Sequence, residues 1–246
     1  MFKFIIIFFI LFIAGCSNNY NWAWYIINPK LDSGYSNLQF LLSGLSITLT
    51  ISLISIFFSL LIGFFVSLLY LNNSRILRWI NYSYIEIFRS IPLLVLLLWV
   101  YYGLPVVFGI SFGPFMAGII SLALSDSAFE AEIFRAGLQS VSKGQKDAAK
   151  SIGLNSYQEM RLIVLPQALR IILPAICNQF IYVLKMSSLV SIIGLADLTR
   201  KANELVVSVY RPLEIYSFLV LEYLFLILII SYFVRKLEKR FNNHQN

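Results

Sequence analysis

The sequence predicts an all-α protein that crosses a membrane several times, and three observations support this fold class. Hydrophobic residues make up 59% of the chain and charged residues 13%, whereas soluble domains have about 45–50% and about 25%. Two long stretches, Ser33–Ser74 and Ser90–Ser125, carry no charged side chain. A soluble domain of 246 residues cannot bury so much apolar surface. The same composition excludes a disordered chain and a nucleic-acid-binding domain.

The first 16 residues are typical of a secretory signal or an N-terminal anchor. Lys3 precedes the apolar run Phe4–Ile13, which is shorter than the roughly 20 residues of a spanning helix. The run ends in Ile13-Ala14-Gly15-Cys16, which resembles a bacterial lipobox. Two interpretations stay open, since the segment is either cleaved and lipidated at Cys16 or retained as an anchor. Residues 17–37 predict an extracytoplasmic linker rich in aromatic residues.

Residues 38–240 predict a membrane domain of about five core helices. Their apolar runs are about Gln39–Leu71, Tyr84–Leu104, Phe115–Arg135, Leu162–Lys185 and Pro212–Val234. Glycines and prolines between 103 and 114 predict a tight turn between the second and third helices. Pro166 and Pro174 predict kinks in the fourth helix. Residues 136–161 predict one substantial hydrophilic loop, and residues 186–211 are of mixed composition.

The basic residues predict how the helices are oriented. Thirteen of them gather on one side of the predicted helices: Lys3, Arg75, Arg78, Arg135, Lys143, Lys146, Lys150, Arg161, Arg170, Arg235, Lys236, Lys239 and Arg240. Five gather on the other: Lys30, Lys185, Arg200, Lys201 and Arg211. Because cytoplasmic loops carry the excess of Lys and Arg, the first side is cytoplasmic and so is the C-terminus. The net charge of +7 is explained in the same way.

Several kinds of chemistry are excluded by the residues that the sequence lacks. His244 is the single histidine, and Cys16 and Cys177 are the two cysteines. These are too few for a histidine-based catalytic site, a zinc site or a disulfide framework. The sequence contains no G-x-x-x-x-G-K-[ST] motif, so it lacks the loop that cradles nucleotide phosphates.

The hydrophilic loop carries the most informative motif of the chain. It reads Gly144-Gln145-Lys146-Asp147-Ala148-Ala149-Lys150-Ser151-Ile152-Gly153-Leu154, and Ile163 follows Gly153 after nine residues. We expect Asp147 in the first turn of a short helix, where a negative charge is favourable. Ala148 and Ala149 are expected to keep one face of this helix small, and Gly153 to end it in a left-handed conformation. The loop therefore predicts a short exposed helix on which a partner docks.

This spacing resembles the EAA loop of the permease subunits of binding-protein-dependent ABC importers. That loop has Glu-Ala-Ala, three residues, Gly, nine residues and Ile-x-Leu-Pro, and Asp147 stands where the family usually has Glu. Four further segments resemble the polar amino acid branch of the family: 88–95 with 101–105, 131–137, 165–170 and 187–194. The resemblance covers about residues 38–235. Met186 departs from it, because the branch often has a polar or acidic residue after the lysine at this place.

The resemblance implies a type I ABC importer transmembrane domain in the bacterial cytoplasmic (inner) membrane, with its coupling loop at about residues 141–166. It implies a transport subunit for polar amino acids, not an enzyme, with no cofactor in this chain. ATP and Mg²⁺ are bound by a partner ATP-binding subunit. The implied docking residues are Gly144, Asp147, Ala148, Ala149, Gly153 and Leu154. The other implied partners are a second permease subunit, identical or a sister chain, and an extracytoplasmic solute-binding protein, with no nucleic acid.

Acidic residues inside the third predicted helix form a second candidate site. Asp126 and Glu130 are four residues apart and share one helical face. An ionisable group near the bilayer centre costs about 2.5–3.5 kcal/mol, so it has a partner or a function. One interpretation is a polar stripe along the substrate path, and the other is internal pairing, for example with Lys185. The candidates for this path are Asp126, Glu130, Glu132, Lys185, Ser187 and Ser188.

Two further functions use the same carboxylates. Asp126, Glu130 and Glu132 are the candidates for a membrane-embedded enzyme or a secondary transporter. Against the enzyme stands the lack of any nucleophile–base arrangement. Against the secondary transporter stands the lack of an internal repeat. Two charge pairs are also expected within single helices, Glu86 with Arg89 and Glu132 with Arg135.

Overall fold

The computed structural model describes residues 20–71 and 74–242, and this part of the chain is helical without any strand. Its elements are η1 (Trp24–Ile27), α2 (Asp32–Leu71), α3 (Arg75–Ser90), α4 (Leu93–Leu98), η2 (Trp99–Gly103), α5 (Leu104–Phe108), α6 (Pro114–Gln139), α7 (Lys143–Ser151), α8 (Ser156–Glu159), η3 (Met160–Val164), α9 (Leu165–Met186), η4 (Ser187–Ile193), α10 (Leu198–Val209) and α11 (Pro212–Asn242). The predicted N-terminal segment and Cys16 lie outside the described residues.

Several of these helices have the length and composition of membrane spans. Asp32–Tyr70, Ser156–Ile193 and Pro212–Lys236 are long and apolar enough to cross a bilayer. Arg75–Ser90 and Leu93–Phe108 make a fourth span if the bent pair is taken as one. α6 is not among them, because its acidic residues lower the hydropathy of a helix that is otherwise long enough. The fold is that of an all-α membrane protein, as predicted.

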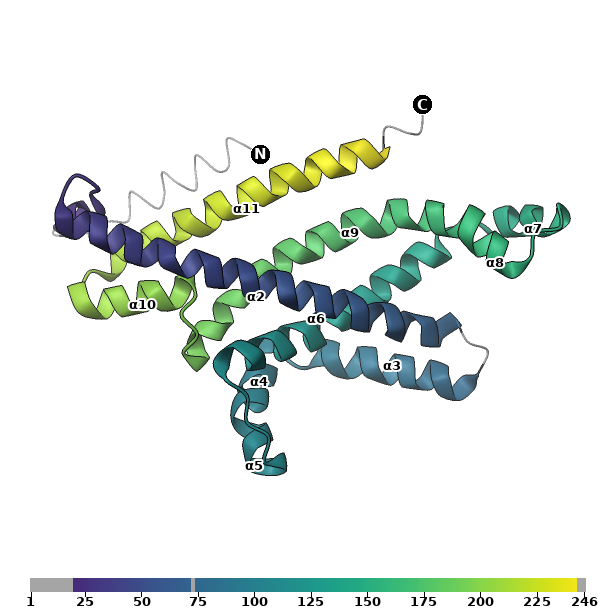
Figure 1. Cartoon of the computed structure of the whole chain (residues 1–246), viewed down its shortest axis with the longest axis horizontal. Helices are drawn as coiled ribbons and strands as arrows, with labels where there is room; N and C mark the ends of the chain where they lie inside the picture. Colours follow the sequence, from purple (N-terminus) through teal and green to yellow (C-terminus); the bar gives the residue numbers. More distant parts are fainter. Residues whose placement is uncertain (1–19, 72–73, 243–246) are drawn as a thin grey trace.

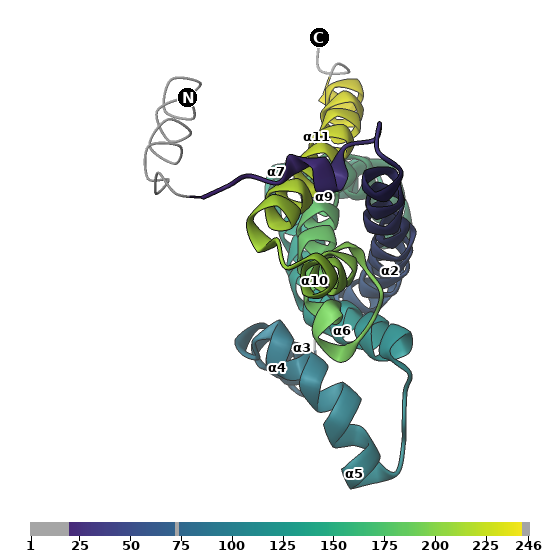
Figure 2. The ribbon, with the colours of Figure 1, turned by 90° about the vertical axis from the view of Figure 1, so that its left-hand side faces the viewer.

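The prediction of one continuous second helix over Tyr84–Leu104 is wrong. α3 ends at Ser90, and the axis turns by 96° before the chain continues as α4. Ile91 is extended (φ −83°, ψ 122°) and Pro92 follows it. A proline disfavours the helical conformation of the residue before it and donates no backbone hydrogen bond, so the helix breaks here. Figure 2 shows α4 and α5 projecting away from the other helices.

Other boundaries differ less from the prediction. α2 begins at Asp32 rather than Gln39, with the carboxylate in its first turn, where it is favourable. The turn predicted between residues 103 and 114 is confined to residues 109–113, because α5 continues through Pro105 to Phe108. Gly109 is left-handed in this turn (φ 68°), and α6 begins at Pro114. The mixed segment of residues 186–211 forms η4 and α10.

The centre of the molecule is the contact between α2 and α6, which run side by side with α9 next to them (Figure 1). A methyl group on Gly63 of α2 would lie 2.6 Å from Cβ of Glu130 in α6, so only glycine permits this approach. Ile51, Leu97 and Val190 belong to the largest buried apolar cluster, which joins α2, α4 and η4 to α6. This packing places α6, which carries the candidate carboxylates, in the middle of the helix bundle.

The chain before α2 is held against the first turn of α11. The two carboxylate oxygens of Glu214 accept hydrogen bonds from the Tyr20 hydroxyl and the Ala23 backbone N–H, each at 2.7 Å. Arg211 Nη1 donates to the Asn21 carbonyl at 3.0 Å. Below these contacts, Ile26 packs in a second apolar cluster with residues of α2, α10 and α11. We call the contacts of Tyr20, Asn21 and Ala23 with Arg211 and Glu214 the N-terminal latch.

Candidate functional site

The loop with the docking motif forms a short helix at one end of the molecule (Figure 1). α7 follows the extended residue Ser142 and packs against α8 and η3. Its last carbonyls are satisfied by the N–H groups of Ile152, Gly153 and Leu154 at 3.0–3.2 Å. Gly153 has a φ of 83°, a conformation that favours glycine. The predicted left-handed end of the helix is confirmed.

Two details predicted for this helix are wrong. Asp147 is the fifth residue of α7 rather than part of its first turn, because the helix begins earlier, directly after Ser142. The two alanines do not share one accessible face either. Ala149 is buried against the chain itself, with 2% of its surface exposed, whereas Ala148 is exposed. Ala148 is therefore accessible from outside, and Ala149 is not.

The outer surface of this end carries large exposed apolar side chains beside the polar residues of α7. Ile152 is 75% exposed and Tyr157 of α8 is 70% exposed. Gly144 and Ala148, one helical turn apart on α7, add small side chains beside them. A short helix with small and apolar residues turned outward allows a partner to approach the backbone closely. We call Gly144, Ala148, Ile152 and Tyr157 the outer face of the coupling end.

Asp126 lies in the middle of the helix bundle and is fully engaged. It receives a hydrogen bond from Ser59 Oγ of α2 and one from Gln179 Nε2 of α9, each at 2.5 Å. Its residue surface is 3% exposed. Asp126 therefore ties three helices together, and Ser59 and Gln179, not Lys185, are its partners. These partners come from runs far away in sequence, so the sequence alone gave no signal of them.

Glu130 lies one turn further along α6 and is enclosed even more completely. None of its surface is exposed, and neither carboxylate oxygen has a hydrogen-bond partner among the described residues. The close approach of Gly63 covers it from α2. Glu130 shares a face with Asp126, as predicted, but this face is packed and not open to a path in this conformation.

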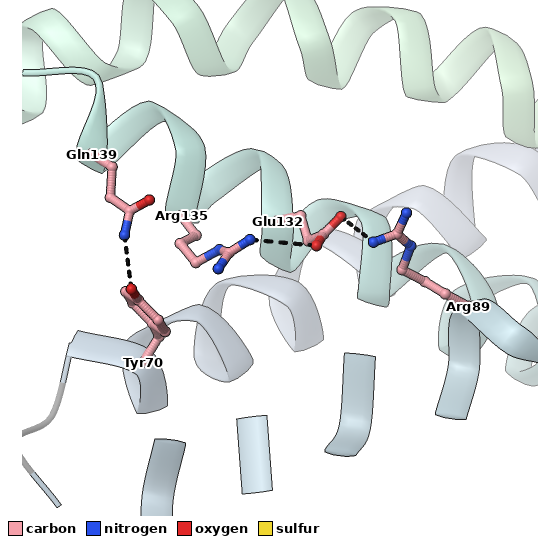
Figure 3. A network of polar contacts seen from close by, with 5 residues as sticks. All are labelled: Tyr70, Arg89, Glu132, Arg135 and Gln139. Atoms are coloured by element: carbon pink, nitrogen blue, oxygen red, sulfur yellow. Dashed lines mark hydrogen bonds and ion pairs between the residues drawn. The ribbon is translucent and has the colours of Figure 1, made fainter. Parts of the chain in front are cut away.

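Glu132 belongs to a separate polar cluster near the end of α6 (Figure 3). Its carboxylate contacts Arg89 Nη1 of α3 at 2.5 Å and Arg135 Nη2 at 3.5 Å. The expected pair of Glu132 with Arg135 is present, whereas Arg89 pairs with Glu132 across two helices and not with Glu86. Gln139 Nε2 donates to the Tyr70 hydroxyl at 3.0 Å and joins α6 to the end of α2.

Lys185, Ser187 and Ser188 lie where α9 passes into η4. Lys185 is exposed. Ser187 is buried and its hydroxyl donates to the Leu184 carbonyl at 2.8 Å, and the Ser188 hydroxyl donates to the Lys185 carbonyl at the same distance. The structure thus separates the six candidate path residues into the enclosed Asp126 and Glu130, the Glu132 cluster, and this junction.

The placement of the carboxylates bears on the alternative functions predicted for them. The three carboxylates do not converge on one pocket, and no group of three or more potential metal ligands occurs within the described residues. This does not favour the enzyme or the secondary transporter.

The chain belongs to the family of binding-protein-dependent transport system inner membrane components. The family model matches residues 59–243. This range includes α7, the carboxylates of α6 and the junction of α9 with η4.

Related proteins and solved structures agree with this membership. The chain is 36% identical to the arginine transport system permease protein ArtQ of Bacillus subtilis, over 89% of this chain and 100% of that protein. It is 37% identical to a probable glutamine ABC transporter permease protein, GlnM, of the same species, over 84% and 95%. The crystal structure of an amino acid ABC transporter with histidines matches with a TM-score of 0.80 and 39% identity, covering 85% of this chain and 97% of that one.

A more distant structure shows the same fold. The inward-facing MetNI methionine ABC transporter superposes with a TM-score of 0.70 at 24% identity, over 83% of this chain and 97% of that one. The predicted type I ABC importer transmembrane domain is confirmed.

Proposed function

We propose that this chain imports polar amino acids across the bacterial cytoplasmic membrane and that a separate ATP-binding subunit supplies the energy. The observation that carries this proposal is the exposed coupling end, where α7 presents Ala148 and Ile152 beyond the membrane helices. The names of its relatives, which transport arginine and glutamine, support the substrate class. The sequence has no phosphate-binding loop of its own, so ATP and Mg²⁺ belong to the partner.

The ATP-binding subunit docks on the outer face of the coupling end. Gly144 and Ala148 let the partner approach α7, Asp147 and Leu154 flank the contact, and Gly153 ends the helix with the required turn. Ala149 supports the helix from inside. ATP binding draws two such subunits together and moves the two coupling ends with them. This motion opens the path outward and hydrolysis resets it, which is an equilibrium between two conformations biased by ligands.

The remaining partners follow from the family. A second permease subunit, identical or a sister chain, completes the path, and a solute-binding protein delivers the substrate on the outer side. In the orientation predicted from the basic residues, α7 and the C-terminus are cytoplasmic, whereas η1 and α10 are outside. The excess of basic residues on the α7 side supports this arrangement.

The substrate path involves the junction of α9 with η4 more directly than the acids of α6. Lys185 is exposed there and lies next to Ser188, so it can attract the carboxylate of an amino acid. Asp126, Glu130 and Ser187 are enclosed in this conformation and reach a substrate only when α2, α6 and α9 separate. Glu132 is paired with Arg89 and Arg135 and holds α3 against α6.

The test compares two substitutions that each place an aspartate on α7. Ala148→Asp alters the outer face, whereas Lys150→Asp lies on a different side of the same helix and changes the charge by more. The tagged chain is purified from native membranes in a mild detergent, and copurifying proteins are identified. Uptake of labelled arginine and glutamine is then measured in vesicles loaded with ATP.

A protein with a G-x-x-x-x-G-K-[ST] motif should copurify with the native chain and with Lys150→Asp, and should be lost with Ala148→Asp. Uptake should be lost with the same variant. If no such protein copurifies with the native chain, the proposed ATP coupling is wrong. If it copurifies equally with all three chains, the proposed outer face is wrong.

A further inference from the structure

A cavity between α2, α3 and α6 is lined by an unusual number of cationic side chains. Its volume is about 270 Å³, which is room for a headgroup-sized ligand, since one water occupies about 30 Å³ of liquid. The lining residues are Tyr70, Arg78, Asn81, Tyr82, Ile85, Glu86, Arg89, Glu132 and Arg135. Three arginines therefore face two glutamates, so the lining carries a net positive charge.

Two of these arginines, Arg89 and Arg135, are held in place by contacts that leave part of their N–H donors available. The guanidinium of Arg135 lies over the ring of Tyr70 and that of Arg89 over the ring of Phe129, each 5.2 Å from the centroid. Both contact the single carboxylate of Glu132 (Figure 3). Nε of Arg135 is buried and has no hydrogen-bond partner within the described chain. A guanidinium has five N–H donors, so one shared carboxylate leaves most of them for another oxygen-rich anion.

The position of the cavity indicates where such an anion comes from. Tyr70 is the last residue of the apolar span Asp32–Tyr70, and the charged residues of α3 begin with Arg75. Such a transition from apolar to charged residues is expected at the headgroup level of a bilayer. On α3, Ile76 is 71% exposed, Trp79 68% and Tyr82 66%. Tyr and Trp are enriched at this level of a membrane. A cationic cavity therefore opens beside an exposed apolar and aromatic helix surface.

We propose that this cavity binds the phosphate group of a membrane phospholipid. Arg89 and Arg135 donate to its oxygens, Arg78 adds charge at the entrance, and the acyl chains lie along the exposed apolar side of α3. The bound lipid holds α3 against α6 in addition to the Arg89–Glu132 contact. The inference is independent of the transported substrate and of the ATP-binding partner.

The test uses the full-length chain in a mild detergent and native mass spectrometry. The probes are dioctanoyl phosphatidylglycerol, dioctanoylglycerol, which has the same chains without phosphate, and inorganic phosphate. We expect one phosphatidylglycerol per chain to be retained at least tenfold more strongly than dioctanoylglycerol. An equal concentration of inorganic phosphate should not displace it, because the acyl chains contribute to binding.

Variants locate the bound lipid. Arg135→Gln and Arg78→Gln should each weaken retention roughly tenfold, the size expected when a charge-assisted contact is lost. Arg75→Gln removes the same charge three residues from Arg78, outside the cavity, and should leave retention unchanged. Gel filtration and circular dichroism show that each variant is folded. If Arg135→Gln does not fold, Arg78→Gln still decides, since Arg78 takes no part in the ion pairs of Glu132.

Three results would overturn the proposal. Equal retention by the native chain, Arg78→Gln and Arg135→Gln would place the lipid elsewhere. Equal retention of dioctanoylglycerol would show an apolar contact without phosphate recognition. Displacement by an equal concentration of inorganic phosphate would make the cavity a site for a free anion.

Discussion

At the scale of single residues, Asp197 shows how one side chain joins two helices. Its Oδ1 accepts the backbone N–H of Arg200 at 2.8 Å and so caps α10, and the residue is fully buried. The next backbone N–H, that of Leu198, donates to Thr48 Oγ1 of α2 at 3.2 Å. A methyl group on Gly44 would lie 2.6 Å from the backbone of Asp197 and Leu198. The start of α10 is therefore pressed directly against α2.

Two replacements of Asp197 distinguish the stability contributed by the N-cap hydrogen bond from that contributed by the carboxylate charge. Asp197→Ala removes the acceptor and should destabilise the protein by about 0.5–2 kcal/mol, the usual cost of losing an N-cap. Asp197→Asn keeps an oxygen at the same place and should cost much less. Thermal unfolding in detergent measures both. Equal losses for the two variants would show that the carboxylate charge, and not the cap, stabilises this contact.

The same residue predicts a dependence on pH. Burial raises the pKa of Asp197 from 3.8 to about 6. The folded protein then binds the proton more tightly than the unfolded chain does. The stability that this protonation contributes is complete below pH 3.8 and is lost as the pH rises through about 6. The native chain should thus gain about 2 kcal/mol relative to Asp197→Asn on going from pH 7 to pH 4.

Melting temperatures of both chains at the two pH values check this prediction. Other groups titrate in the same interval, so the relevant quantity is the difference between the two chains. A difference that does not change with pH would contradict the raised pKa.

At the scale of elements, glycines decide how closely the helices approach. A methyl group on Gly137 of α6 would lie 2.2 Å from Cγ1 of Ile172 in α9. Ile172 is itself buried, with 2% of its surface exposed. The contact of these two residues holds α6 and α9 together next to the coupling end.

A pair of substitutions tests this contact. Gly137→Ala should destabilise the protein by about 1–3 kcal/mol through overpacking, and Ile172→Ala by about 2–5 kcal/mol through the cavity that it leaves. The double variant should cost less than the sum, because the new methyl group fills part of that cavity. Thermal unfolding of the four chains measures the coupling, and strict additivity would contradict it.

The sequence predicted the elements whose signals are local and missed those that depend on distant partners. The end of α2 at Leu71, the turn at Gly109 and the end of α7 at Gly153 follow from apolar runs and glycines. The partners of Asp126 could not be predicted, since Ser59 and Gln179 are serine and glutamine residues in apolar runs without any distinguishing pattern. The bend before Pro92 did have a local signal, but the uncharged run around it favoured a continuous helix.

At the scale of the whole molecule, the N-terminal latch joins the chain before α2 to the start of α11, the last helix. Tyr20 and Ala23 precede the first long helix, whereas Glu214 begins the last one. The latch therefore closes the bundle on the side opposite to α7. It also keeps η1 against α10 and α11 through the cluster around Ile26.

Replacing Glu214 should release the segment before α2 from the start of α11. Glu214→Ala leaves the Ala23 N–H and the Tyr20 hydroxyl without their acceptor, so residues 20–31 should become more accessible. Limited trypsin digestion in detergent should then cleave after Lys30 several times faster than in the native chain. Glu204→Ala is the control, because it breaks the exposed pair with Arg200 on α10 without touching the latch. Equal rates for native and Glu214→Ala would contradict the role given to the latch.

The length of α2 has a mechanical consequence. Its 40 residues form a rod about 60 Å long, at 1.5 Å per residue, and this is about twice the 30 Å of the hydrocarbon core. The rod touches η1 and α10 at its first turns, holds Asp126 through Ser59 in the middle, and meets Gln139 through Tyr70 at its far end. A tilt of about 5° about one end displaces the other by about 5 Å. A rigid rotation of α2 about one end would thus convert a small movement on one side of the membrane into a larger displacement on the other.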